Sequence, residues 1–157
     1  MKIEYSEDAL IIYIHRYEAS MDFTNKSKVE QYFRGLFLKL KKYYGIELSG
    51  YYNIEVYYDK VYGAIIQLEK EELDYYPSFD ETLDMRISII SDQSILYKIE
   101  EYTREFKGKW YFYKDQYYLK IEKPVEKKKM GNLLEMSIPV YGEEAKEAVQ
   151  YGRELKQ

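Results

Sequence analysis

The sequence predicts an α+β fold with antiparallel sheets, because two kinds of hydrophobic pattern follow one another along its 157 residues. Short runs in which apolar and polar residues alternate are typical of strands with one face on a core and one face in water. A longer stretch near the N-terminus spaces its apolar residues as an amphipathic helix does. The order strand, helix, hairpin occurs twice, so we expect two β-α-β-β units, each with a helix on one face of its sheet, plus a C-terminal helix.

The first unit begins with a strand and a helix. Residues 10–14, LIIYI, are a short apolar run rich in β-formers, which predicts a buried strand. Residues 25–45 carry one apolar stripe and predict a helix. Ser27 and Glu30 have the spacing of a capping box at its start, and Gly45 supplies the stop at its end.

A hairpin and an acidic stretch follow this helix. Residues 51–70 contain two alternating runs that meet around Asp59 and Lys60, which predicts a β-hairpin. Residues 73–83 are acidic and contain Pro77, so the alternation stops there. We expect this stretch to be a linker or a long loop.

The second unit repeats the same signals. Residues 85–90, MRISII, predict a strand, and residues 92–106 predict a helix capped by Asp92. The helical stripe consists of Ile95, Ile99, Tyr102 and Phe106. Residues 110–123, WYFYKDQYYLKIEK, predict a hairpin that turns near 114–116.

The C-terminal part contains three further segments. Residues 124–132, PVEKKKMGN, are a basic break that we expect to be a loop. Residues 133–141 predict one short strand, and residues 142–155 predict a helix that Gly152 weakens. The expected organisation is a first unit at 1–72, a linker at 73–83, a second unit at 84–124 and an extension at 125–157.

The repeated order of elements favours an internal duplication. The two hairpins end alike, in QLEK at 67–70 and KIEK at 120–123. Whether the two halves share one sheet stays open at this point. A joined sheet or a homodimer would protect edge strands that separate small units expose.

Composition excludes several classes of protein. The net charge of −4 argues against general attraction to nucleic acid, because such binders carry a basic surplus. The absence of cysteine excludes disulfides, thiol nucleophiles and thiolate metal sites. No apolar run is long enough to span a bilayer, and the start lacks a signal-peptide pattern. We therefore expect a cytoplasmic protein without a membrane segment.

Three stretches and the order of elements resemble a known family. The stretches are MKIEYSEDALIIYI at the start, NIEVYYDKVYGAIIQLEK in the first hairpin and YFYKDQYYLKIEK in the second. Together they resemble the MecA adaptor proteins of Gram-positive bacteria, which are negative regulators of genetic competence. The resemblance implies an adaptor whose N-terminal unit holds a target protein and whose C-terminal unit docks on a Clp-type AAA+ unfoldase.

Candidates for catalysis or metal binding are few. His15 is the sole histidine, so it is the one possible imidazole base, and it stands at the end of a strand without a serine elbow or a cysteine. No glycine-rich phosphate loop occurs. The acids that could pair for acid/base work lie on expected wet faces or in the linker, namely Glu55, Asp59, Asp80, Glu81 and Asp84. We therefore expect no cofactor, no metal and no enzyme activity.

The 21 tyrosines offer the strongest surface hypothesis. Strand alternation places Tyr57, Tyr111, Tyr113 and Tyr118 on the face opposite the apolar set, where they would form an outward stripe. Such a stripe could bind a protein partner or stack single-stranded bases beside Lys109, Lys114 and Lys120. It could also serve the sheet alone, since tyrosine is a good β-former.

The sequence thus favours a non-enzymatic protein-interaction module, an adaptor or regulator that binds a protein through its tyrosine-rich sheet face. One alternative is a single-stranded nucleic-acid-binding protein. Another is a small carboxylate-dependent enzyme, whose mark would be a concave pocket enclosing at least two acids.

Overall fold

The computed structural model describes residues 2–5, 9–15, 25–48, 50–71, 83–90 and 95–156. Over these ranges the strands form two five-stranded sheets, and three helices accompany them. This arrangement confirms the predicted α+β class with a C-terminal helix. Most of the acidic stretch at 73–83 lies outside the described residues.

The chain divides into two compact units by its contacts. The first comprises residues 1–14, 18–56 and 65–90, and the second comprises residues 15–17, 57–64 and 91–157. The tip of the first hairpin, residues 57–64, therefore belongs with the second unit.

The first sheet has the strand order β1-β2-β4-β3-β5. Its strands are β1 (Lys2–Tyr5), β2 (Ala9–His15), β3 (Gly50–Asp59), β4 (Gly63–Glu71) and β5 (Leu83–Ile90). The strand predicted at 10–14 and the hairpin around Asp59 are confirmed. The strand predicted at 85–90 exists as β5, but it lies beside β3 at the edge of the first sheet. The expected start of the second unit at residue 84 is therefore wrong. Alternation of apolar and polar residues identifies a strand but does not show which strand it will pair with.

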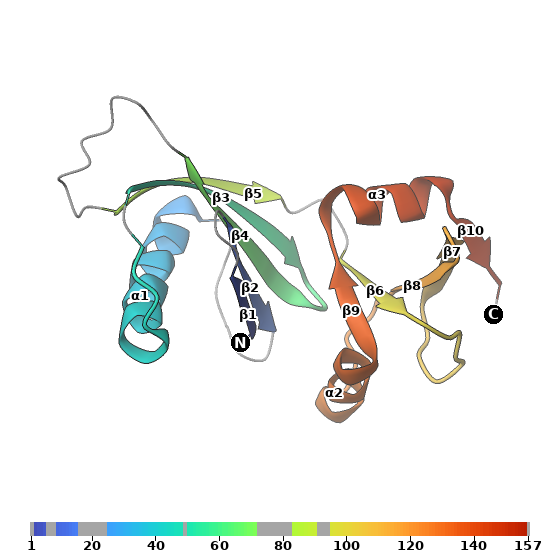
Figure 1. Cartoon of the computed structure of the whole chain (residues 1–157). Helices are drawn as coiled ribbons and strands as arrows, with labels where there is room; N and C mark the ends of the chain where they lie inside the picture. The colour runs from blue at the N-terminus through green and yellow to red at the C-terminus, as the bar shows by residue number, and fades with distance from the viewer. Residues whose placement is uncertain are drawn as a thin grey trace. The chain divides into compact units, whose positions relative to one another are not determined.

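Helix α1 (Lys26–Tyr44) is the predicted first helix, and Figure 1 shows it on one side of the first sheet. Its buried stripe consists of Val29, Phe33, Leu36, Phe37 and Leu40. Asn25, and not Ser27, caps its start, because the Asn25 side chain accepts a hydrogen bond from the backbone N–H of Lys28 at 3.2 Å. Gly45 ends it with φ of 65°.

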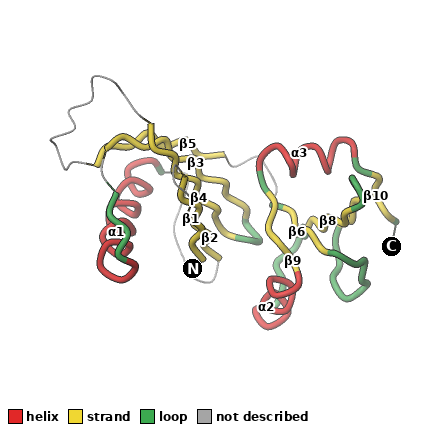
Figure 2. The backbone as a smooth tube through the Cα atoms, viewed as in Figure 1, coloured by secondary structure: helices red, strands yellow, loops and turns green. Residues whose placement is uncertain are grey.

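The second sheet is antiparallel, with the order β10-β7-β8-β6-β9. Its strands are drawn in yellow in Figure 2. Its strands are β6 (Leu96–Ile99), β7 (Lys109–Tyr113), β8 (Gln116–Lys120), β9 (Ser137–Val140) and β10 (Arg153–Leu155). The predicted hairpin at 110–123 turns at Lys114 and Asp115, whose φ angles are 49° and 60°. Two consecutive residues with positive φ are what a tight hairpin turn requires.

Helices cover both faces of this second sheet. Figure 1 shows α2 (Lys127–Met136) and α3 (Gly142–Tyr151) on opposite sides of its strands. On one face the hydroxyl of Tyr97 donates to the sulfur of Met130 in α2, at 3.7 Å. On the other face Ala145 and Ala148 of α3 pack on the sheet. The expectation of one helix on one face therefore applies to the first sheet alone.

Two expected elements of the second unit are corrected. Residues 95–106 of the helix predicted at 92–106 contain strand β6 and irregular backbone, and Asp92 lies outside the described residues. Conversely, the basic break at 124–132 is not a loop throughout, because α2 begins within it at Lys127. The repeated strand-helix-hairpin order is thus absent from the described residues 95–124, which contain β6, β7 and β8 and no helix.

The remaining C-terminal predictions agree with the structure. The short strand expected within 133–141 is β9, preceded by the end of α2. The expected C-terminal helix is α3, and Gly152 ends it through a hydrogen bond from its N–H to the carbonyl of Ala148 at 3.0 Å. None of the helices in the described part of the chain is long and apolar enough to cross a bilayer.

Candidate functional site

The tyrosine-bearing face of the second sheet lies beneath α3. Leu96, Tyr111, Tyr118 and Val140 of the sheet form one buried cluster with Ala145 and Ala148, and Tyr113 packs against it. The two alanines stand three positions apart on one face of α3, and their small side chains allow the helix to approach the rings closely. Helix α3 therefore occupies the surface on which a partner was expected.

Three of the four predicted partner-binding tyrosines are buried. Tyr57, Tyr111 and Tyr118 are 8%, 6% and 3% exposed, and Tyr113 is half-buried. The alternation was predicted correctly, since Tyr111 lies directly opposite Tyr118 across β7 and β8. The expectation of an outward stripe is wrong, because large apolar rings gain free energy when a later element covers them.

Tyr57 is buried within the second unit at the hairpin tip. Its ring centroid lies 4.8 Å from that of Tyr141, with the ring planes tilted by 53°. Such tilted aromatic pairs stabilise packing beyond the area that they bury. Tyr57 thus anchors the hairpin tip beside the residue that precedes α3.

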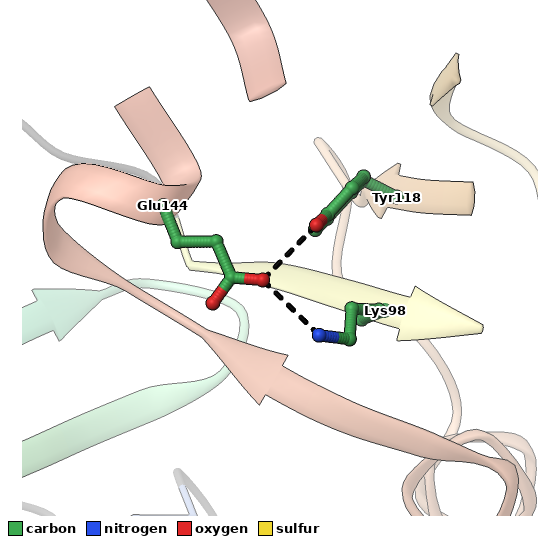
Figure 3. A network of polar contacts seen from close by, with 3 residues as sticks. All are labelled: Lys98, Tyr118 and Glu144. Atoms are coloured by element: carbon green, nitrogen blue, oxygen red, sulfur yellow. Dashed lines mark hydrogen bonds and ion pairs between the residues drawn. The ribbon is translucent and has the colours of Figure 1, made fainter. Parts of the chain in front are cut away.

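A small polar network joins α3 to the tyrosine face, as Figure 3 shows. The hydroxyl of Tyr118 donates to Oε1 of Glu144 at 3.0 Å, and Nζ of Lys98 approaches the same oxygen at 3.1 Å. One turn along the helix, the hydroxyl of Tyr113 donates to Oε2 of Glu147 at 3.3 Å. The acids of α3 thus provide acceptors for phenols whose rings are covered.

This network suits structural support better than catalysis. Burial, and then the hydrogen bond to Glu144, raise the pKa of Tyr118 to about 12. Burial also raises the pKa of Tyr111, assisted by the charge of Glu154. A general acid or base works best with a pKa near the ambient pH, and these shifts move both phenols away from neutrality.

The other candidates for chemistry have structural roles or lie apart. The rings of His15, at the end of β2, and of Tyr62 form a T-shaped pair with centroids 5.8 Å apart. Asp59 binds backbone instead of facing open water: its carboxylate accepts from the N–H groups of Val61, Tyr62 and Ile95. Among the described residues no group of histidines and acids could hold a metal ion. Asp80, Glu81 and the side chain of Asp84 lie outside the described part.

The geometry offers no stacking platform for nucleic-acid bases at the tyrosine stripe. Its rings lie beneath α3, whereas base stacking requires an open aromatic face. Lys109 pairs with Glu122 at 3.4 Å, and this hydrogen bond raises the pKa of Lys109. Nζ of Lys114 lies 5.2 Å from the ring centre of Tyr113.

A surface that the sequence reasoning missed lies where β9 begins, and we call it the edge groove. It is an open hollow of about 470 Å³ lined by Lys98, Ile99, Glu100, Glu101, Glu135, Met136, Ser137 and Ile138. Met136 and Ile138 are 43% and 62% exposed, although both are large and apolar. The sign of this surface in the sequence was the apolar pair Met136 and Ile138, which stands where α2 ends and β9 begins. The sequence did not show that β9 lies at the edge of its sheet.

The edge groove is acidic, but its acids resemble surface carboxylates. Glu100, Glu101 and Glu135 are all exposed. Two carboxylates act as separate acid and base when one lies in an apolar pocket and the other in a polar, solvated site. All three acids of the edge groove lie in water. The groove therefore contains the acids that an enzyme would need without enclosing them.

Comparisons with known proteins add no assignment to this geometry. No protein-family model matches the chain, and neither the curated proteins nor the solved structures give a significant match.

Proposed function

We propose that this chain is a non-enzymatic, cytoplasmic adaptor or regulator whose edge groove binds a short, extended, cationic segment of a partner protein. The observation that carries this proposal is the exposure of Met136 and Ile138 beside an acidic rim at the edge of the second sheet. The proposal keeps the expected class of function and moves its site away from the tyrosines.

Strand β9 favours an extended occupant because it is an edge strand. It pairs with β6 on one side, and the strand order places it at the end of the sheet. Edge strands accept added strands through their outer backbone groups, while side-chain pockets give specificity. Pro139 lacks an N–H, so backbone pairing along β9 is short and side-chain anchors carry more of the affinity.

The charges of the groove favour a cationic occupant. Three acids line it together with Lys98, and the ammonium of Lys98 is already paired with Glu144 at 3.1 Å. Lysine or arginine side chains of a bound segment would meet these acids, while its apolar side chains covered Ile138 and Met136. Complementary charges at a rim raise the rate of encounter and select the partner.

The resemblance to MecA adaptors is compatible with this proposal. It implies that the second unit docks on a Clp-type AAA+ unfoldase and that the first unit holds a target. Under that interpretation the edge groove is the surface of the second unit where docking should be sought.

The first prediction concerns a short synthetic peptide in which Lys and Val alternate. Fluorescence anisotropy should detect its binding. Ile138→Thr should weaken that binding about tenfold, because the peptide covers the exposed part of this side chain and covering threonine in place of isoleucine forgoes roughly 1–1.5 kcal/mol. The matched control is Val149→Thr, which alters an exposed apolar residue of α3 outside the groove and should leave affinity unchanged.

Two outcomes would contradict the proposal. Equal binding of a peptide in which Glu replaces Lys would exclude charge recognition by the groove. Equal affinity of the Ile138→Thr and Val149→Thr variants would show that the peptide binds elsewhere.

A further inference from the structure

Helix α1 concentrates positive charge in an acidic protein. It contains six basic residues and one acidic residue, which gives a net charge of +5, whereas the whole chain has −4. Two of these cations are paired, Arg34 with Glu30 at 3.0 Å and Lys41 with Glu47 at 3.2 Å. Lys39 and Lys42 make no ion pair with any residue in the described ranges.

The exposed side of α1 also carries an apolar side chain. Leu38 is 70% exposed and lies on the side of the helix opposite its buried stripe. We call the solvent side of the helix, formed by Lys28, Gln31, Gly35, Leu38, Lys39 and Lys42, the α1 outer face. One exposed apolar side chain between charged flanks can serve as an anchor for a docked helix.

Gly35 is the third feature of the α1 outer face. It lies in the middle of the helix, where glycine destabilises relative to alanine. A Cβ added at Gly35 would meet no atom within 4 Å, so the described structure contains no close contact that requires a glycine there. The missing side chain leaves a flat place beside Leu38, on which another backbone can lie close.

We propose that the α1 outer face docks an acidic amphipathic helix of a partner protein. Apolar residues of that helix would cover Leu38, its backbone would approach at Gly35, and its acids would pair with the flanking lysines. Helices recognise one another in this way, through apolar anchors placed between charged flanks. This proposal is independent of the edge groove, which lies in the other unit.

The distribution of charge favours a short acidic helix over a larger polyanion. With +5 on α1, the rest of the chain has a net charge of −9. Nucleic acid or an anionic bilayer would extend beyond a helix about 28 Å long, and a chain with this net negative charge does not attract large polyanions in general. A helix of similar length needs no contact beyond the cations of α1.

The second prediction uses a synthetic helical peptide with leucine along one face and glutamate elsewhere. Gly35→Ala should weaken its binding about three- to tenfold, because the added methyl group separates the two backbones, while the melting temperature rises from improved helix propensity. Weaker binding together with a higher melting temperature would exclude unfolding as the cause of the lost affinity. Leu38→Ala should weaken binding as well.

A matched control exists in α2, where Gly131 is also exposed and surrounded by open space. Gly131→Ala should raise the melting temperature and leave binding unchanged. The proposal is overturned if Gly35→Ala binds as tightly as the parent, or if a peptide with lysine in place of glutamate binds equally. Tighter binding of a single-stranded oligonucleotide or of phosphatidylserine vesicles would also overturn it.

Discussion

Tyr118 illustrates how a single residue joins burial to hydrogen bonding. Its ring is 3% exposed, which removes apolar area from water, and its hydroxyl then requires a partner inside the protein. Glu144 supplies that partner, and its charge is balanced by Lys98. The phenol is therefore held in its neutral, proton-donating form.

The third prediction concerns alkaline pH. The pKa of Tyr118 is raised to about 12, above its ordinary value near 10, so an unfolded chain releases this proton at a lower pH than the folded chain. The folded state then binds more protons across this interval, and its stability should fall between about pH 10 and about pH 12. Below this interval the contribution is fully present. Tyr118→Phe should make this decline shallower in urea unfolding measured at successive pH values.

An exposed tyrosine provides the control for that measurement. Tyr151 is 67% exposed, so Tyr151→Phe removes a phenol from the surface and serves as the comparison. An equal decline in the parent and in Tyr118→Phe would show that Tyr118 does not keep its proton in the folded state.

Residue patterns predicted which tyrosines share a face but not what covers that face. The alternation of residues 110–113 identifies Tyr111 and Tyr113 as neighbours on one side, and the structure agrees. Helix α3 covers this face through Ala145 and Ala148, which follow more than 30 positions later in the chain. The residues of a strand do not indicate which distant helix will pack on it. Sequence alone therefore could not distinguish a core face from a binding face.

At the scale of elements, the tip of the β3–β4 hairpin depends on one carboxylate. Oδ1 of Asp59 accepts hydrogen bonds from the N–H groups of Val61 and Tyr62 at 2.7 and 3.2 Å. Oδ2 accepts from Ile95 at 3.2 Å, the residue that precedes β6. Asp59 thus closes the turn and attaches it to the next strand of the second unit.

The fourth prediction tests this attachment. Asp59→Ala should reduce the free energy of unfolding by about 1–3 kcal/mol, because partly buried N–H groups lose their acceptor. Asp59→Asn should cost less, since its amide oxygen can still accept. Urea unfolding gives both values, with Lys60→Ala in the same turn as a control expected to change stability by less than about 0.5 kcal/mol. Equal effects of Asp59→Ala and Lys60→Ala would contradict the role of the carboxylate.

Elements were predicted well where one pattern is long and poorly where it is short. The stripe of α1 extends over about three turns and indicated a helix, whereas Ile95 and Ile99 suit both a helical spacing and a short buried strand. Helix α2 was missed because its lysine run indicated a solvated loop, although lysine is a good helix former and Met130 and Leu133 supply a buried side. Strand β5 was found but given to the wrong unit.

At the scale of the whole molecule, the two units carry candidate surfaces of opposite charge. The α1 outer face of the first unit is basic, and the edge groove of the second unit is acidic. The basic side of α1 follows from the predicted helix, whereas the edge groove could not be derived from sequence, because it depends on which strand lies at the edge of the sheet. Two surfaces with different preferences are what an adaptor requires, since it must bind two partners without competition between them.

The most direct test of this account is a titration of isotope-labelled protein followed by NMR, with the cationic strand peptide and the acidic helical peptide added in separate experiments. The fifth prediction is that the first peptide shifts amide signals within 98–101 and 135–138, and that the second shifts those within 28–42. Ile138→Thr should weaken the strand peptide alone and Gly35→Ala the helical peptide alone, because independent sites are not coupled. Shifts at one shared set of residues, or at Tyr111, Tyr113 and Tyr118 with loss of α3 signals, would contradict it.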